Sequence, residues 1–238
     1  MPHLHRFYHP ATPPLAGEIS LDRDEAHHAM RVLRARLGDE VELFNGQGHA
    51  WQGAIASLAR NEVLVSIGGE RFVPRPAPEV TLAQAWLHRD KPIDELVRQA
   101  TVLGASRICF FRAEHSEKQP RIAEKWGRLA VEACKQCGRF WLPEFDVATS
   151  LADVLEAAAG QQIVLASMEG PHQPLANLSR ERPVTYIVGP EGDFSHEEQT
   201  RAREAGVLSI SLGQYTLRSE TAAITGLTLI QHHLGHLG

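Results

Sequence analysis

The 238-residue sequence lacks several features that would set it apart from ordinary globular proteins. It holds no apolar run near the roughly 20 residues that a membrane helix requires. Its N-terminal MPHLHRFYHP lacks the apolar core of a signal peptide. Its three cysteines are too few, and odd in number, for a disulfide framework. We therefore expect a cytoplasmic protein that makes no contact with a membrane.

Motifs for metals and for nucleotide phosphates are also missing. Cys134 and Cys137 form one CxxC pair, which we interpret as small helix-packing residues because no second pair accompanies it. No spacing of His and Cys fits a metal site, so we expect none. GxGxxG, GxxxxGKS and GxxxxGKT do not occur, which argues against an NAD-linked oxidoreductase and against a polyphosphate cradle.

The overall charge does not point to a nucleic-acid partner. The formal net charge is −5, although Lys and Arg outnumber Glu between residues 107 and 139. The distribution of charge matters more than its sum for nucleic-acid binding. An RNA contact and a solvated helix face are both consistent with this local excess.

The first 72 residues indicate a small β-rich domain. Asp22 or Asp24 should cap a helix that runs through Leu33. The stretch FVPRPAP carries three prolines in seven residues, and residues 73–79 are therefore interpreted as a semi-rigid linker. Strands are expected at residues 4–8, 19–21, 40–44, 50–56 and 62–67, between turn signals such as NGQG and ARNE.

Residues 80–238 change to alternating strands and helices, which is typical of an α/β fold. Strands are expected at residues 80–85, 107–111, 163–166, 186–188 and 207–212. Helices are expected at residues 92–103, 123–137, 151–158 and 222–234.

Two glycine-marked loops within residues 185–226 are the most informative part of this domain. The first, GPEGD, follows an apolar strand, and Gly189 and Gly192 can take backbone angles closed to other residues. Ser195 and Glu198 then form a capping-box pattern at a helix start. The second loop, GQYTLRSET, also follows a strand and opens onto an apolar helix.

Such loops at the carboxyl ends of neighbouring strands form a ligand crevice in an α/β sheet. Ser219 or Thr221 is the expected N-cap of the apolar helix. Glycine backbone, the carboxylates of Glu191 and Glu220, and the guanidinium of Arg218 suit a neutral or zwitterionic nucleoside-like ligand. For either loop alone, an ordinary strand-to-helix turn is an equal alternative.

GPEGDFSHEE followed by LGQYTLRSETAA closely resembles the paired signatures of the RsmE family, the uracil-N3 methyltransferases of 16S ribosomal RNA in the SPOUT superfamily. The usual forms are GPEGGFS and LG..ILR.ETA, so Asp193 and Ser219 are mild departures. The resemblance covers nearly the whole chain, including HHAMRVLRARLGDEVELFNGQG and EACKQCGR. It implies a PUA-like RNA-binding β-barrel over residues 1–72 and an α/β SPOUT methyltransferase domain with a C-terminal trefoil knot over residues 80–238.

The resemblance also implies an activity. It implies a homodimer that uses S-adenosylmethionine to methylate N3 of a specific uridine in 16S ribosomal RNA or the small ribosomal subunit. Arg218 would stabilise the charge that develops on the uracil as N3 loses its proton. Glu220 is a candidate general base and equally a candidate cap for the following helix. The residues implied to hold the cofactor are Leu165, Ser167, Met168, Glu169, Gly189, Pro190, Glu191, Gly192, Leu212, Gly213, Leu217, Arg218, Ser219 and Thr221.

Target binding is less well specified. The family usually has a Lys and a Glu in the helix where this chain has Gln99 and Val102. This departure keeps two alternatives open, a non-catalytic RNA-binding ribosome-assembly factor and a SPOUT methyltransferase for another RNA position. The candidate RNA-binding residues are Arg6, Arg31, Arg34, Arg112 and Arg139.

Overall fold

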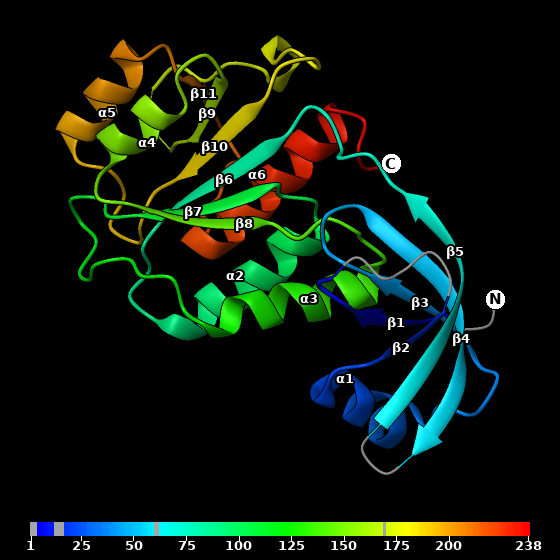
Figure 1. Cartoon of the computed structure of the whole chain (residues 1–238). Coiled ribbons are helices and arrows are strands. Elements are labelled where there is room, and N and C mark those ends of the chain that lie inside the picture. Colours follow the sequence, from blue (N-terminus) through cyan, green and yellow to red (C-terminus); the bar gives the residue numbers. More distant parts are fainter. Residues whose placement is uncertain (1–3, 12–16, 60–61, 169) are drawn as a thin grey trace. The chain divides into compact units, whose positions relative to one another are not determined.

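The structure is a computed structural model of the chain, and it describes residues 4–11, 17–59, 62–168 and 170–238. By its internal contacts the chain divides into two compact units (Figure 1). The N-terminal unit comprises the residues up to Arg75 together with Val131–Leu142, and the C-terminal unit comprises Pro76–Ala130 and Pro143–Gly238. The segment Val131–Leu142, which the sequence places in the second domain, therefore folds with the first.

The N-terminal unit is built on a five-stranded mixed sheet of order β1-β3-β4-β5-β2. β1 and β3 are parallel, and the other neighbouring pairs are antiparallel. Alternate side chains such as Phe7, Leu43 and Trp51 lie in its core. The expected strands are confirmed, although the last two run further than expected. Their bounds are β1 His5–Tyr8, β2 Gly17–Ser20, β3 Glu40–Phe44, β4 His49–Ala59 and β5 Glu62–Phe72.

The expected helix of this unit changes type along its length. Asp22 caps α1 (Arg23–His27) by accepting from the Glu25 backbone N–H at 2.8 Å. The chain then continues as a π-helix over His28–Leu33 and ends at Arg34, whose φ is +53°. Because a π-helix bonds i to i+5, and because Arg34 lies beyond it, Arg31 and Arg34 do not share an α-helical face although they are three positions apart.

The segment Val131–Leu142 is bound to the N-terminal unit by buried contacts. It includes the second half of α3 (Lys125–Cys137). Lys135 and Glu25 form an ion pair with 2.9 Å between Nζ and Oε2, and their side chains are only 7% and 9% exposed. Cys134 packs with Phe44 in a small apolar cluster, and burial raises the pKa of its thiol to about 12. Cys134 is therefore a packing residue, as the sequence suggested.

The C-terminal unit contains a six-stranded, wholly parallel sheet of order β11-β9-β10-β6-β7-β8. The sequence predicted five of its strands and missed β8, an edge strand in which Glu144 and Asp146 alternate with half-buried residues. Such an edge lacks the continuous apolar run of a central parallel strand. The bounds are β6 Val80–Ala85, β7 Arg107–Phe111, β8 Glu144–Ala148, β9 Gln162–Ala166, β10 Val184–Val188 and β11 Leu208–Ile210.

Helices cover both faces of this sheet (Figure 1). α2 (Asp90–Val102), the start of α3 and α6 (Ser219–His233) share one core with alternate strand residues. α4 (Leu151–Ala157) and α5 (His196–Glu204) pack with the intervening strand residues on the opposite face. The unit is therefore a three-layer α/β/α structure. None of its described helices, nor any in the described part of the other unit, is long and apolar enough to cross a membrane.

Candidate active site

The carboxyl ends of the six parallel strands meet at one edge of the sheet. β6 and β10 are neighbours there, but the chain leaves β6 toward β7 and leaves β10 toward β11, in opposite directions. This reversal is the topological switch point at which α/β sheets bind ligands. A cavity of about 770 Å³ lies at this edge and is lined by the loops that follow β6, β7, β9, β10 and β11.

A buried hydrogen-bond network joins the two glycine-marked loops. Ser219 Oγ donates to the Gly189 carbonyl and accepts from Gln84 Nε2 at 2.8 Å. The N-cap of α6 is Arg218, and no side chain caps it, so the expected cap by Ser219 or Thr221 is wrong. The Ser219 hydroxyl is turned instead toward the loop after β10. A bond predicted to be local is therefore a tertiary one.

In the loop after β10 the left-handed backbone occurs at Asp193, whereas Gly189 and Gly192, where the sequence suggested unusual backbone angles, do not have a positive φ. Asp193, where the resembling family has glycine, adopts a φ of +59° and accepts from the Phe194 N–H through Oδ1 at 2.8 Å. Asp tolerates this left-handed region better than most residues. The capping box is confirmed, because Ser195 and Glu198 exchange both of its hydrogen bonds.

Most of the side chains predicted to hold a cofactor line this cavity, and so do both predicted catalytic residues, Arg218 and Glu220. Arg218 is exposed, and Glu220 is half-buried in the first turn of α6. Leu165 is buried in the core beneath, and Thr221 is exposed outside the lining. Glu169 lies outside the described residues.

The sequence motifs did not indicate the part of the cavity wall that follows β6 and β7. His88 and Arg89 come from the first of these loops, and His115 and Glu117 come from the second. Asp193 and Gly192 accept from His115 Nδ1 through their carbonyls at 2.9 and 3.0 Å, and these bonds raise the pKa of His115. A possible signal was the parallel topology, which brings every loop after a strand to the same edge.

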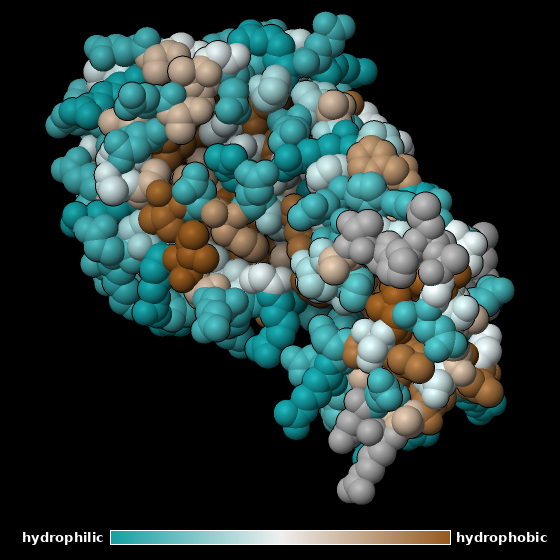
Figure 2. Space-filling model, in the orientation of Figure 1, coloured by the Kyte–Doolittle hydropathy of each residue, from teal (hydrophilic) through white to brown (hydrophobic). Residues whose placement is uncertain are grey.

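Exposed apolar side chains lie on the rim of the cavity. Met168 is 52% exposed and Tyr215 is 74% exposed, although both line it. In Figure 2 the surface of the C-terminal unit is mostly hydrophilic, and its deepest brown area lies on the left-hand side of the view. An apolar rim at a polar surface is typical of a binding site.

The family assignment follows from comparison with known proteins. A family model described as an RNA methyltransferase domain matches residues 74–231, well over half of the chain. The chain belongs to the RNA methyltransferase family. A second model, described as an RNA methyltransferase PUA domain, matches residues 21–68.

Individual relatives agree with this assignment. The chain is 29% identical to the ribosomal RNA small subunit methyltransferase E of Aquifex aeolicus over 96% of this chain and 100% of that protein. The Synechocystis protein of the same name is 28% identical over 91% of this chain and 73% of that protein. The resemblance to the RsmE family is thereby confirmed.

Solved structures have the same fold. A probable rRNA-methyltransferase from Porphyromonas gingivalis superposes with a TM-score of 0.87 at 27% identity, covering 98% of this chain and 99% of that one. A Legionella pneumophila protein with the bound cofactor SAM superposes with a TM-score of 0.79 at 28% identity, covering 96% and 97%.

The arginines predicted to bind RNA lie in unlike surroundings in this RNA methyltransferase. Arg31 and Arg34 are exposed. Arg6 is half-buried, and its Nε donates to Glu42 Oε2 at 2.9 Å. Burial lowers the pKa of Arg139, so its charge is partly desolvated. Arg6 and Arg139 are therefore built into the N-terminal unit, whereas Arg31 and Arg34 are accessible.

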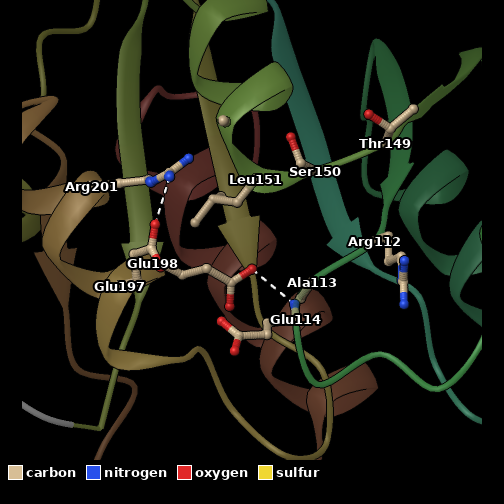
Figure 3. A pocket seen from close by; sticks show the side chains of 10 residues that line it. Arg112, Ala113, Glu114, Thr149, Ser150, Leu151, Glu197, Glu198 and Arg201 are labelled. Atoms are coloured by element: carbon tan, nitrogen blue, oxygen red, sulfur yellow. Dashed lines mark hydrogen bonds and ion pairs between the residues drawn. The ribbon is translucent and has the colours of Figure 1, made fainter.

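Arg112 lines a second cavity in this methyltransferase, of about 320 Å³, at the ends of β7 and β8 (Figure 3). The view shows Arg112 across the pocket from Arg201, which pairs with Glu197 at 2.6 Å. Glu198 accepts from the Glu114 backbone N–H at 3.0 Å in the same pocket. Arg112 thus lines the same cavity as the carboxylates of Glu114, Glu197 and Glu198, at the edge of the sheet that also holds the larger cavity.

Gln99 and Val102, which replace the usual Lys and Glu of the family, both lie on the surface of α2. Gln99 is exposed on α2 and donates to Glu95 at 2.8 Å, and Val102 is 43% exposed. Within the described ranges, no group of three or more His, Cys, Asp or Glu side chains is arranged to hold a metal ion.

Proposed function

We propose that this chain binds S-adenosylmethionine in the larger cavity and transfers its methyl group to N3 of a uridine in small-subunit (16S) ribosomal RNA. The observation that carries the proposal is the single cavity to which the loops after β9, β10 and β11 all contribute. The names of the relatives support the choice of small-subunit ribosomal RNA. The SAM-bound Legionella structure supports the choice of cofactor.

The residues present fit this cofactor. The cavity volume of about 770 Å³ lies within the usual range for small-molecule sites. Ala166, Val188 and Leu212 supply apolar wall suited to an adenine ring. The carboxylates of Glu191 and Glu220 suit the positive charges of the sulfonium and amino groups.

The protein's own task is to position the acceptor and to manage its charge. When bound, the cofactor supplies an electrophilic methyl group. Uracil N3 carries a proton and is enclosed by pairing or stacking, so the target base must reach the cavity unpaired or flipped out. The Arg218 guanidinium would stabilise negative charge on the uracil carbonyls, and its neighbour Ser219 is fixed by the hydrogen bond to Gly189.

Three further parts of the proposal concern architecture. The N-terminal unit, as a closed PUA-like barrel, would bind RNA through exposed residues such as Arg31 and Arg34. The C-terminal unit would be knotted, with α6 packed against β6, β10 and α2. A homodimer would use the exposed Val102 and Leu229 on α2 and α6, and sedimentation velocity would test it. A cytoplasmic location stays a prediction.

Calorimetric titration with S-adenosylmethionine, followed by methylation of small subunits from a strain that lacks the corresponding enzyme, tests the function. We expect saturable cofactor binding and one new N3-methyluridine, detected by mass spectrometry of the ribosomal RNA. No cofactor binding would favour the non-catalytic assembly factor. A methyl group on a ribose 2′-OH or on transfer RNA would favour another SPOUT activity.

Arg218→Ala tests the catalytic assignment. The exposed Arg218 side chain can be shortened with little effect on folding. We expect methyl transfer to fall by about 10²–10³-fold, as for the loss of one transition-state charge partner. Arg203→Ala is the control, because Arg203 is an exposed arginine on α5 that does not line the cavity. Near wild-type turnover of Arg218→Ala would refute the role.

A further inference from the structure

One imidazole on the cavity wall is paired with a carboxylate. His88, from the loop after β6, has its Nδ1 2.5 Å from Oε2 of Glu117, from the loop after β7. The two side chains are 52% and 65% exposed, and both line the larger cavity. Neither the sequence motifs nor the cofactor-loop residues include this pair.

The backbone of His88 is held from two other directions. Its N–H donates to Glu191 Oε1 at 3.1 Å, and its carbonyl accepts from Lys118 Nζ at 3.0 Å. These contacts come from the loops after β10 and β7, so three strand ends position the ring. These contacts fix the backbone from which the imidazole ring extends.

The pairing determines which ring nitrogen is left to act. A carboxylate oxygen accepts only, so the Nδ1 of His88 carries the hydrogen and Nε2 keeps its lone pair in the neutral ring. A carboxylate behind an imidazole also stabilises the imidazolium that forms when Nε2 takes a proton. His115 differs, because its Nδ1 donates to two backbone carbonyls.

The position of the pair matches the part of the reaction that has no assigned residue. The loops expected to hold the cofactor follow β9, β10 and β11, whereas His88 and Glu117 follow β6 and β7. The wall that they form is therefore free to face the acceptor base. Imidazole is the side chain whose charge changes nearest to neutral pH, which suits proton removal from uracil N3 better than the carboxylate of Glu220.

We propose that His88 is the general base of methyl transfer and that Glu117 is its positioning residue. The N3 proton passes to Nε2 of His88, and the N3 electron pair forms the bond to the methyl carbon. The electron pair of the broken sulfur–carbon bond stays on sulfur, which becomes a neutral thioether. The inference rests on the proposed function, since it needs an acceptor nitrogen that carries a proton.

Single-turnover methyl transfer at saturating cofactor and RNA, measured across pH 5 to 9, tests the inference. We expect His88→Ala to lower the rate by about 10²–10⁴-fold and to remove the fall in rate on the acid side. Glu117→Gln should lower the rate less, because the imidazole remains. His49→Ala is the matched control, since His49 forms a similar pair with Glu70 at 2.7 Å outside the cavity, and it should keep the wild-type rate and pH profile.

Rescue of His88→Ala by added imidazole distinguishes the loss of a general base from a change in the structure. It should restore a substantial part of the His88→Ala rate, while cofactor affinity by calorimetry and the circular dichroism spectrum stay those of the wild type. The charged groups around His88 in the wild type are Glu117, Lys118, Glu191 and Arg89, and all variants are compared at the same ionic strength. His88→Gln, which keeps a polar side chain but has no nitrogen that can take the proton, should lose the rate as His88→Ala does.

The outcomes distinguish this inference from the proposed function. If the wild type methylates N3 and His88→Ala keeps its rate, or if imidazole restores nothing, the general-base role is refuted and the function stands. If the wild type methylates no uridine N3, the proposed function itself is refuted. A His88→Gln variant that keeps the wild-type rate and acid limb would also overturn the inference.

Discussion

A close approach between α6 and β10 in the C-terminal unit yields a prediction with a built-in control. A Cβ placed on Gly226, in α6, would lie 2.0 Å from Oη and 2.2 Å from Cζ of Tyr186 in β10. Tyr186 is fully buried, and its hydroxyl donates to the Ala222 carbonyl at 2.8 Å. Gly226→Ala must therefore displace either the ring or the helix.

The expected loss of stability in Gly226→Ala has two sources. Forcing one methyl group into a well-packed core typically costs about 1–3 kcal/mol. Moving the ring also breaks the hydrogen bond of a buried hydroxyl, which costs about 1–3 kcal/mol if no new partner is found. Gly127 supplies the comparison, because it lies within α3 and a Cβ there would meet nothing within 4 Å. Gly127→Ala should stabilise the protein by up to about 1 kcal/mol through helix propensity.

Both substitutions gain the same helix propensity, so the difference between the two variants isolates the steric cost. We expect Gly226→Ala to have a free energy of unfolding lower than that of Gly127→Ala by about 2–6 kcal/mol, the sum of the two costs. Urea unfolding followed by far-ultraviolet circular dichroism, with full equilibration in both directions, measures it. Equal midpoints for the two variants would refute the packing argument.

Further predictions concern single side chains. Burial raises the pKa of Cys109 to about 11 and of Cys134 to about 12, so iodoacetamide at pH 8 should label the exposed Cys137 first, as seen by peptide mass spectrometry. The carbonyls that accept from His115 raise its pKa above the ordinary 6.5, so its NMR titration midpoint should be higher. Its contribution to stability is fully present below pH 6.5 and is lost as the pH rises through the folded-state pKa. Ser219→Ala removes the link between the two loops, and we expect the free energy of unfolding to fall by about 1–3 kcal/mol and the affinity for S-adenosylmethionine to weaken. An unchanged affinity would show that the link does not shape the cavity.

Local signals predicted the parts of this protein that depend on neighbours in the chain. The mainly apolar runs at residues 80–85 and 186–188 became parts of central strands, because a strand buried on both faces is largely apolar. The Ser195–Glu198 capping box formed because both of its bonds lie within one helical turn. The motif loops face one cavity because parallel strands end at one edge.

Sequence patterns did not predict the features that depend on contacts between distant segments of the chain. Ser219 has the residue type of an N-cap, yet its hydroxyl bonds the carbonyl of Gly189, thirty positions earlier. β8 forms because β7 offers it an edge, although its own sequence is too polar to indicate a strand. The Lys135–Glu25 ion pair connects the second half of α3 to α1, and that half of α3 belongs to the N-terminal unit.

The sequence by itself therefore determined the strands other than β8, the capping box and the family of this protein, because each depends on residues that are close together along the chain. Only the tertiary structure decided that His88 meets Glu117 and that Gly226 must remain without a side chain. Both depend on the separation of atoms that the chain brings together from distant positions, and no local pattern records that separation.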